Sequence, residues 1–152
     1  MANLRATLSY DGTNFHGWQT QPGLRTVQET LETALADLTA ERIRVNASGR
    51  TDTGVHALGQ VVNFHTNSRL APEVILRATN ARLPEDVILR TADAVDDTFD
   101  ANRSARRKLY RYVIHDGNVP DLFQRRYAHH CRYRLDEVRM REAAFALVGT
   151  HD

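Results

Sequence analysis

Residues 26–40, with the sequence TVQETLETALADLTA, carry the clearest secondary-structure signal in the chain. Apolar side chains recur there at the spacing of one helical face: Val27, Leu31, Ala34, Leu35 and Leu38. Thr26 and Glu29 have the S/T-x-x-E spacing of a capping box, in which both side chains accept hydrogen bonds from backbone N–H groups at the start of a helix. We therefore predict an amphipathic helix that begins after Thr26 and ends near Ala40.

Strand-like segments flank this helix on both sides. Leu4–Tyr10 alternates loosely between apolar and polar residues, and Asp11-Gly12 ends it with turn chemistry. Beyond the helix we expect a short strand at 43–47, a strand at 59–65, a helix from Pro72 to Leu83-Pro84, and a strand that starts at Val87. This β-α-β-β-α-β order predicts an α+β fold: a ferredoxin-like unit over residues 1–102, with an antiparallel sheet and the helices on one face.

The pattern restarts after this unit. Residues 109–115, with the sequence LYRYVIH, are rich in β-forming side chains and predict a strand. Asp136 is placed to cap a helix that has one apolar side and a glycine stop at Gly149. We interpret residues 103–152 as the opening strand and helix of a second unit, which further strands would be needed to complete.

The composition excludes several classes of protein. With 41% apolar and 26% charged residues, the 152-residue chain can form a core. No apolar run approaches the ~20 residues that span a bilayer, and the N-terminal residues lack the apolar stretch of a signal peptide. The one cysteine allows no internal disulfide. These features predict a soluble cytoplasmic protein that does not associate with a membrane.

Basic residues are concentrated late in the chain. Residues 1–102 hold 9 Lys/Arg and 13 Asp/Glu, a balance of −4, whereas residues 103–152 hold 11 and 6, a balance of +5. The basic run consists of Arg103, Arg106, Arg107, Lys108 and Arg111. It fits either a solvated strand end or a surface that contacts nucleic-acid phosphates. Tyr110 and Tyr112 alternate with Arg111, so a tyrosine there either half-buries against a helix or stacks on an unpaired base.

The loop at residues 48–58, SGRTDTGVHAL, is the most informative stretch for function. Two glycines give its backbone freedom, and it lies between two predicted strands. Arg50 is two residues from Asp52, and a nearby cation would hold a carboxylate ionised, ready to act as a nucleophile or base. The alternative is a turn in which Asp52 caps backbone N–H groups. His129, His130 and Cys131 lack the spacing of metal ligands, so we expect no metal site.

Five motifs in one order along the chain resemble the tRNA pseudouridine synthase A family. They are Tyr10-Asp11-Gly12-Thr13 with Gly17-Trp18-Gln19, Thr26-Val27-Gln28 with Ala34-Leu35, Ser48-Gly49-Arg50-Thr51-Asp52 with Gly54-Val55-His56-Ala57, Asn80-Ala81-Arg82-Leu83-Pro84, and Lys108-Leu109-Tyr110-Arg111-Tyr112. The resemblance implies the pseudouridine synthase fold and an isomerase that converts uridine to pseudouridine at positions 38–40 of the tRNA anticodon stem-loop. It also implies a homodimer and a reaction without metal or cofactor.

The resemblance also assigns roles to individual residues. Asp52 stands at the catalytic aspartate, Arg50 at the arginine that partners it and fills the space left by the extruded nucleotide, and Tyr110 at the tyrosine that packs on the flipped base. The further substrate contacts that we expect are His56, Arg106, Arg107, Lys108 and Arg111. Two rival interpretations are a non-catalytic RNA-binding module on the same fold and a nonfunctional truncation product.

The chain departs from the family pattern in two respects. Phe99-Asp100-Ala101-Asn102 stands where the family has Phe-x-Ala-Arg, and Arg103 follows one place later. The family is also longer, and its second half supplies the rest of the sheet, a further basic residue of the cleft and much of the dimer contact. We therefore expect the chain alone to have little or no activity.

Overall fold

The computed structural model describes residues 1–151 and divides the chain into two units. The first is Met1–Lys108, and the second runs from Leu109 onward. The sequence placed this boundary earlier, after Asn102. In the structure Lys108 still contacts the first unit, since its Nζ atom would lie 3.2 Å from a Cβ atom at Gly49.

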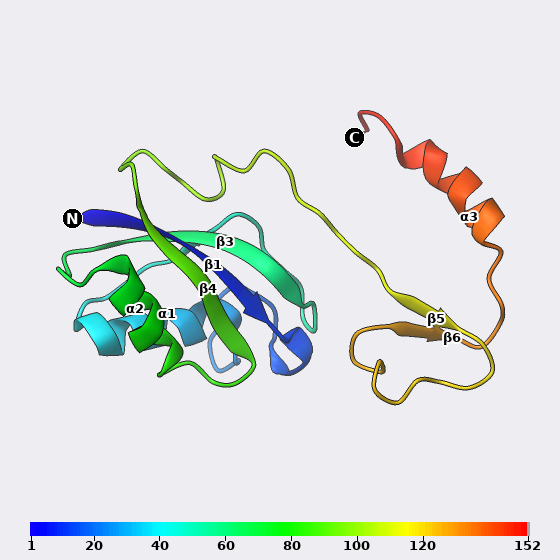
Figure 1. Ribbon diagram of the computed structural model, residues 1–152, viewed down its shortest axis with the longest axis horizontal. Coiled ribbons are helices and arrows are strands. Elements are labelled where there is room, and N and C mark those ends of the chain that lie inside the picture. The colour runs from blue at the N-terminus through cyan, green and yellow to red at the C-terminus, as the bar shows by residue number, and fades with distance from the viewer. Residues whose placement is uncertain (152) are drawn as a thin grey trace. The chain divides into compact units, whose positions relative to one another are not determined.

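The first unit has the predicted β-α-β-β-α-β order (Figure 1). Its elements are β1 (Ala2–Tyr10), α1 (Val27–Thr39), β2 (Asn46–Ala47), β3 (Ala57–Thr66), α2 (Pro72–Asn80) and β4 (Val87–Val95), with a 3-10 turn, η1 (Gly12–Asn14), after β1. The strands form one sheet in the order β2-β3-β1-β4, and each neighbouring pair is antiparallel. The predicted α+β fold is therefore confirmed.

The core lies between one face of the sheet and the two helices. Alternate residues of β1 are buried on that face, and their partners on β3 are apolar, with Leu4 opposite Phe64 and Ala6 opposite Val62. Both helices contribute to the same cluster through Leu31, Leu35 and Ile75. The intervening residues of β1, such as the exposed Arg5, face the other way. This alternation is typical of an antiparallel sheet with one covered face.

The start of α1 differs from the predicted capping box. Thr26 has the extended backbone of an N-cap residue, but its side chain makes no capping hydrogen bond. The backbone oxygens of Gly17 and Trp18 instead accept the N–H groups of Val27 and Gln28, at 3.2 and 3.0 Å. The Thr26 hydroxyl is buried without a hydrogen-bond partner in the described chain. The capping-box prediction is therefore wrong, because a distant backbone segment satisfies the helix start.

The strand predicted at 43–47 is shorter in the structure, where only Asn46–Ala47 pairs with β3. Just before β2, side chains of α1 provide the backbone hydrogen bonds that a neighbouring strand would otherwise provide. The Val45 N–H donates to the Glu32 carboxylate at 2.9 Å, and the Val45 oxygen accepts from the Gln28 amide at 3.2 Å. This part of the chain thus belongs to the core without being part of the sheet.

The second unit contains two short strands and one helix. β5 (Ile114–Asp116) and β6 (His129–Cys131) pair in parallel, and α3 (Glu137–Ala144) continues into a 3-10 turn, η2 (Phe145–Leu147). The strand prediction for 109–115 is mostly wrong, because only its end lies beside another strand and a ladder needs a partner. The predicted cap of the helix is confirmed, since the Asp136 carboxylate accepts the N–H groups of Val138 and Arg139.

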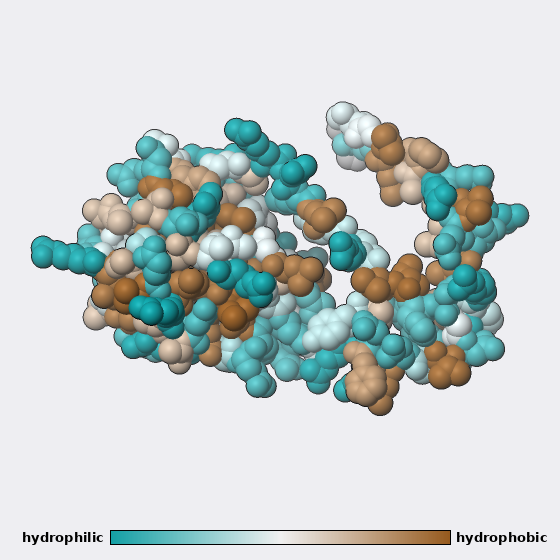
Figure 2. Space-filling model, viewed as in Figure 1, coloured by the Kyte–Doolittle hydropathy of each residue, from teal (hydrophilic) through white to brown (hydrophobic). Residues whose placement is uncertain are grey.

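The apolar side chains of the second unit are exposed. None of its described residues is buried, and Phe123, Phe145 and Leu147 are 85%, 70% and 79% exposed. Figure 2 shows apolar side chains interspersed with polar ones on its surface. The one-sided apolar pattern of α3 and η2 therefore has no covering partner within residues 109–151. Across residues 1–151, no helix combines the length and apolar character needed to cross a membrane.

The uncapped hydroxyl of Thr26 gives a test of the helix start. Thr26→Val keeps the side-chain shape and removes a buried hydroxyl that lacks a partner, so we expect the free energy of unfolding to rise by about 1 kcal/mol. Thr26→Ser, which keeps the hydroxyl and loses a buried methyl, should lower it by about 1 kcal/mol. Urea unfolding monitored by circular dichroism measures both changes. If Thr26→Val instead destabilises the protein as much as Thr26→Ser, the side chain does act as a cap.

Candidate active site

Asp52 lies on the loop that joins β2 to β3, and its side chain is exposed. Its backbone oxygen accepts the Val55 N–H at 3.1 Å, and Gly54 takes a left-handed φ of +78°, so the loop turns tightly just after Asp52. Within residues 1–151, no backbone N–H donates to the Asp52 carboxylate, which argues against the alternative of a capping aspartate. The Asp52 carboxylate is therefore exposed and has no hydrogen-bond partner within residues 1–151.

Backbone hydrogen bonds hold the loop on both sides of Asp52. The Trp18 N–H donates to the Thr51 oxygen at 2.9 Å, and the Gly54 N–H donates to the Phe15 oxygen at 3.2 Å. Both partners come from residues 12–18, which we call the clamp segment. Because main-chain atoms form these bonds, the position of Asp52 does not depend on any one clamp side chain.

Two glycines of the clamp segment allow the two backbones to approach each other. A Cβ atom at Gly12 would lie 2.1 Å from the Val55 oxygen, so a side chain is sterically excluded there. A Cβ atom at Gly17 would lie 2.8 Å from the Thr51 oxygen, and Gly17 also has a φ of +82°, which glycine alone adopts readily. The glycines of the Tyr10–Gln19 motif thus keep the loop at residues 48–58 in place. We call this loop, which carries Asp52, the acidic loop.

Tyr10 and Thr51 form a side-chain contact beside the catalytic candidate. The two hydroxyl oxygens are 2.8 Å apart, and Tyr10 is buried at the end of β1. Burial raises the pKa of Tyr10, an effect that the hydrogen bond with Thr51 partly opposes, so the phenol keeps its proton at neutral pH. Sequence reasoning missed this contact, although the alternating pattern of β1 already placed Tyr10 on the core face.

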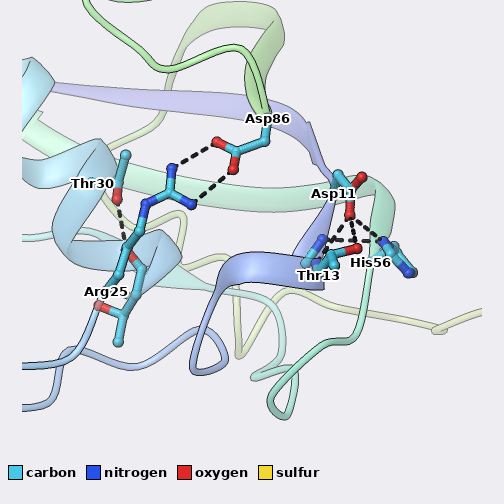
Figure 3. A network of polar contacts seen from close by, with 8 residues as sticks. Asp11, Thr13, Arg25, Thr30, His56 and Asp86 are labelled. Carbon is cyan, nitrogen blue, oxygen red and sulfur yellow. Dashed lines mark hydrogen bonds and ion pairs between the residues drawn. The ribbon is translucent and has the colours of Figure 1, made fainter. Parts of the chain in front are cut away.

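His56 links the far end of the loop to the turn after β1 (Figure 3). Its Nδ1 atom lies 3.1 Å from the Gly12 nitrogen and 3.1 Å from an Asp11 carboxylate oxygen. The same carboxylate oxygen accepts the Thr13 N–H at 3.0 Å. Nδ1 must carry a lone pair to accept from Gly12 and a proton to pair with Asp11, so it makes one of these contacts at a time. The structure thus gives His56 a role in loop attachment, and its expected contact with substrate stays a prediction.

Further contacts fix the ends of the loop and the clamp segment. The Ser48 hydroxyl donates to the Gln60 side-chain oxygen at 3.0 Å, and the Gln60 amide donates to the Gly49 oxygen. Arg25 binds the Asp86 carboxylate through two hydrogen bonds of 2.8 Å (Figure 3) and stacks over the Phe15 ring at 4.0 Å. The acidic loop is therefore supported from both of its flanks.

The basic residues predicted from the sequence fall in both units. Lys108 lies against the acidic loop, since its Nζ atom would be 3.2 Å from a Cβ atom at Gly49. Ten exposed cations of the first unit form no ion pair within the described chain. They include the five predicted from the sequence, which are Arg50, Arg103, Arg106, Arg107 and Lys108, and they also include Arg42, Arg69, Arg77, Arg82 and Arg90. Arg50 thus does not pair with Asp52 in this structure. Tyr110 and Arg111 belong to the second unit, where Tyr110 is 69% exposed.

A metal site finds no support among the described residues. In residues 1–151, no group of three or more histidine, cysteine or acidic side chains is placed to hold an ion. The rings of His115 and His130 have centroids 5.8 Å apart, and each ring nitrogen Nε2 already contacts a backbone oxygen.

Comparison with known proteins gives one consistent result. A family of tRNA pseudouridine synthases matches residues 6–102, which include the clamp segment and the Asp52 loop. The chain is 51% identical over 151 residues to tRNA pseudouridine synthase A of Bacillus subtilis, and 42% identical over 152 residues to tRNA pseudouridine synthase A of Acetivibrio thermocellus. These matches cover 98% and 100% of this chain, and 61% and 62% of the two relatives.

The chain has an α+β fold with an antiparallel sheet, and the acidic loop joins two strands of that sheet. Together with the family match, this arrangement places the protein in the class with the pseudouridine synthase fold. The chain belongs to the tRNA pseudouridine synthase family. It spans about 61% of the length of the curated relatives that it matches.

Gly17 and Gly23 form a matched pair for testing the clamp segment. Both have a positive φ, +82° and +72°, but only Gly17 has backbone atoms within 4 Å of the Cβ position. We expect Gly23→Ala to lower the free energy of unfolding by about 1 kcal/mol, the cost of a left-handed alanine. Gly17→Ala adds the clash with Thr51, so we expect a loss of about 3 kcal/mol.

Denaturant unfolding measures both losses, and hydrogen exchange by mass spectrometry locates them. Gly17→Ala should also speed amide exchange at residues 51–55, because the clash separates this stretch from Trp18. Equal losses for the two variants, with unchanged exchange at residues 51–55, would show that the close approach to the clamp segment does not hold the loop.

Proposed function

We propose that the protein carrying this sequence isomerises uridine to pseudouridine in tRNA, with Asp52 as the catalytic carboxylate. The observation that supports this most strongly is the state of Asp52: it is exposed, it accepts no hydrogen bond within the described chain, and the loop that carries it is fixed by backbone bonds on both sides. A carboxylate in this state has its lone pairs available and loses little freedom when substrate binds.

The chemistry of the isomerisation matches one carboxylate. The N1–C1′ glycosidic bond breaks, the base turns over, a C5–C1′ bond forms, the proton on C5 leaves, and N1 gains a proton. Nothing is oxidised and no group is imported, so the atoms of the substrate suffice without a cofactor. The required protein group is a carboxylate near C1′ that acts as a nucleophile or as a base on the sugar. The exposed position of Asp52 is compatible with both roles.

The target uridine must leave its helix to reach this loop. Extrusion costs a few kcal/mol, and stacking on an aromatic side chain returns roughly 1–3 kcal/mol. We propose that Tyr110 provides this stacking and that Arg50 enters the space that the nucleotide vacates. The exposure of both side chains supports these roles, as does the absence of an acidic partner for Arg50 within residues 1–151.

The charge distribution supports a polyanionic substrate. Four exposed cations, Arg103, Arg106, Arg107 and Lys108, lie within six consecutive residues of the first unit and form no ion pair within the described chain. Unpaired arginine and lysine side chains bind phosphates without first breaking a protein ion pair. We further propose that the substrate region is the anticodon stem-loop at positions 38–40, that His56 and Arg111 also contact it, and that the protein acts in the cytoplasm as a homodimer.

Replacing Asp52 distinguishes the enzyme from a non-catalytic RNA-binding module. In the full-length protein, we expect Asp52→Asn to lower the isomerisation rate by about a thousandfold or more while the affinity for an anticodon-arm RNA stays within about twofold. Asp37→Asn, at an exposed position on α1, is the matched control and should change neither quantity. Tritium release from RNA labelled at uridine C5 measures the rate, because the reaction displaces the C5 proton. Full turnover by Asp52→Asn would refute the catalytic assignment.

The isolated chain should be far less active than the full-length protein. None of the described residues after Lys108 is buried, so residues 109–151 present no packed surface to RNA. In addition, β4 is an edge strand of the first unit, and one of its sides is unpaired. We expect no release of the C5 label above background from an anticodon-arm RNA by residues 1–152 alone. A full-length protein of the relatives' length should turn over the same RNA. Turnover by the isolated chain at a comparable rate would contradict this expectation.

A further inference from the structure

Two buried asparagines lie on the side of the sheet that faces away from α1 and α2. Asn3 on β1 and Asn63 on β3 are each 1% exposed, and the Asn63 amide donates to the Asn3 side-chain oxygen at 3.0 Å. The residues between and beside them on this face, such as Arg5 and His65, are exposed. A buried amide pair on an otherwise exposed face indicates that a particular segment covers it.

The covering segment is the chain that follows β4. The Asn3 amide donates to the backbone oxygens of Asp96 and Phe99, both at 2.9 Å. The Asn63 amide also donates to the Phe99 oxygen, at 3.2 Å, and its side-chain oxygen accepts the Ala101 N–H at 2.9 Å. The two side chains thus form five hydrogen bonds, in which every amide N–H donates and each side-chain oxygen accepts once. Four of the five bonds join the side chains to the backbone of residues 96–101.

Apolar residues of similar size could not replace this pair. They would leave the backbone groups of residues 96–101 buried without partners, and such groups are rarely tolerated. The amides therefore fix where this segment lies and in which direction it leaves the sheet. Ala101 is itself 2% exposed, so the fixed point extends to two residues before Arg103, the first cation of the basic run.

The part of the basic run that belongs to the first unit, Arg103 to Lys108, has contacts at both of its ends. It begins two residues after Ala101, and its last residue, Lys108, lies against Gly49 in the acidic loop. Arg103, Arg106 and Arg107 lie between these two points and are exposed. The chain from Ala101 to Lys108 is therefore a strap, anchored by the asparagine pair at one end and in contact with the loop of Asp52 at the other.

We propose that Asn3 and Asn63 are positioning residues for RNA binding: they anchor the strap so that its cations lie beside the Asp52 loop before RNA arrives. This inference rests on the proposed function for the ligand, a tRNA stem-loop, and goes beyond it by assigning a role to two residues that contact no substrate. A strap that is already ordered contacts phosphates without an ordering cost, whereas a released strap binds more weakly.

The test uses the full-length protein and a fluorescent anticodon-arm RNA at several salt concentrations. We expect Asn63→Ala to weaken RNA binding by about tenfold and to flatten the dependence of the binding constant on salt, since fewer phosphates are neutralised. Asn80→Ala is the matched control: Asn80 also makes two backbone hydrogen bonds, to Leu89 on β4, but it does not touch the strap. Asn80→Ala should leave RNA binding within about twofold of the parent.

A double-mutant cycle separates positioning from a general loss of structure. In a background in which the four cations of the strap (Arg103, Arg106, Arg107 and Lys108) are replaced by glutamine, Asn63→Ala should weaken RNA binding no further, because it acts through those cations. The same loss in both backgrounds, or an equal loss for Asn80→Ala, would overturn the proposal. If Asn63→Ala does not fold, Asn63→Asp serves instead, since it keeps the volume and the acceptor for Ala101 and removes both donors.

Limited trypsin digestion tests the anchor without RNA. Asn63→Ala should be cleaved faster at residues 103–108 than the parent or Asn80→Ala, under conditions in which all three are folded. Unchanged cleavage would overturn the proposal. If cleavage increases as expected but the parent protein does not bind the RNA, the proposed function fails, whereas the anchoring of the strap stands.

Discussion

The close approach of two backbones, residues 12–18 and residues 51–55, is the constraint on which the rest of the candidate site depends. It exists only because Gly12 and Gly17 have no side chains, since a Cβ atom at either would meet backbone atoms of the acidic loop. Once the two segments are this close, main-chain hydrogen bonds fix Thr51 and Gly54, and Asp52, which follows Thr51, is presented to solvent in one place. The two hydrogen bonds that flank Asp52 are therefore made by backbone atoms, and side-chain contacts such as that of Tyr10 with Thr51 add to them.

The same peptide groups also join the loop to the core. The carbonyls of Gly17 and Trp18 accept the first N–H groups of α1, while the Trp18 N–H binds the acidic loop. The clamp segment thus provides acceptors for N–H groups at the positive end of α1, and the same segment is hydrogen-bonded to the acidic loop. Packing of α1 against β1 and β3 then secures the whole assembly through Leu31 and Leu35. A change that disturbs the packing of α1 in the core should consequently also disturb the position of Asp52.

The sequence predicted what depends on local pattern. Apolar periodicity located both helices and the long strands, and the glycine-flanked Asp52 was correctly placed on a loop between strands. Interactions between distant segments were missed. The capping box at Thr26 failed because Gly17 and Trp18, which lie far from Glu29 in the sequence, accept N–H groups of the first turn of α1. The strand at 109–115 failed because a periodic pattern does not reveal which partner strands are present. Asn3 and Asn63 escaped notice because their pairing requires the β1–β3 register, which side-chain alternation does not specify.

His56 joins the Asp52 loop to the turn after β1 through either of two neighbouring residues. When Nδ1 carries the lone pair, the ring accepts from the Gly12 N–H, and when Nδ1 carries the hydrogen, it donates to the Asp11 carboxylate; both atoms lie 3.1 Å from Nδ1. Asp11 and Gly12 are consecutive in the chain, so both arrangements bind the histidine to the same turn. The connection between the two segments therefore does not depend on which ring nitrogen carries the hydrogen.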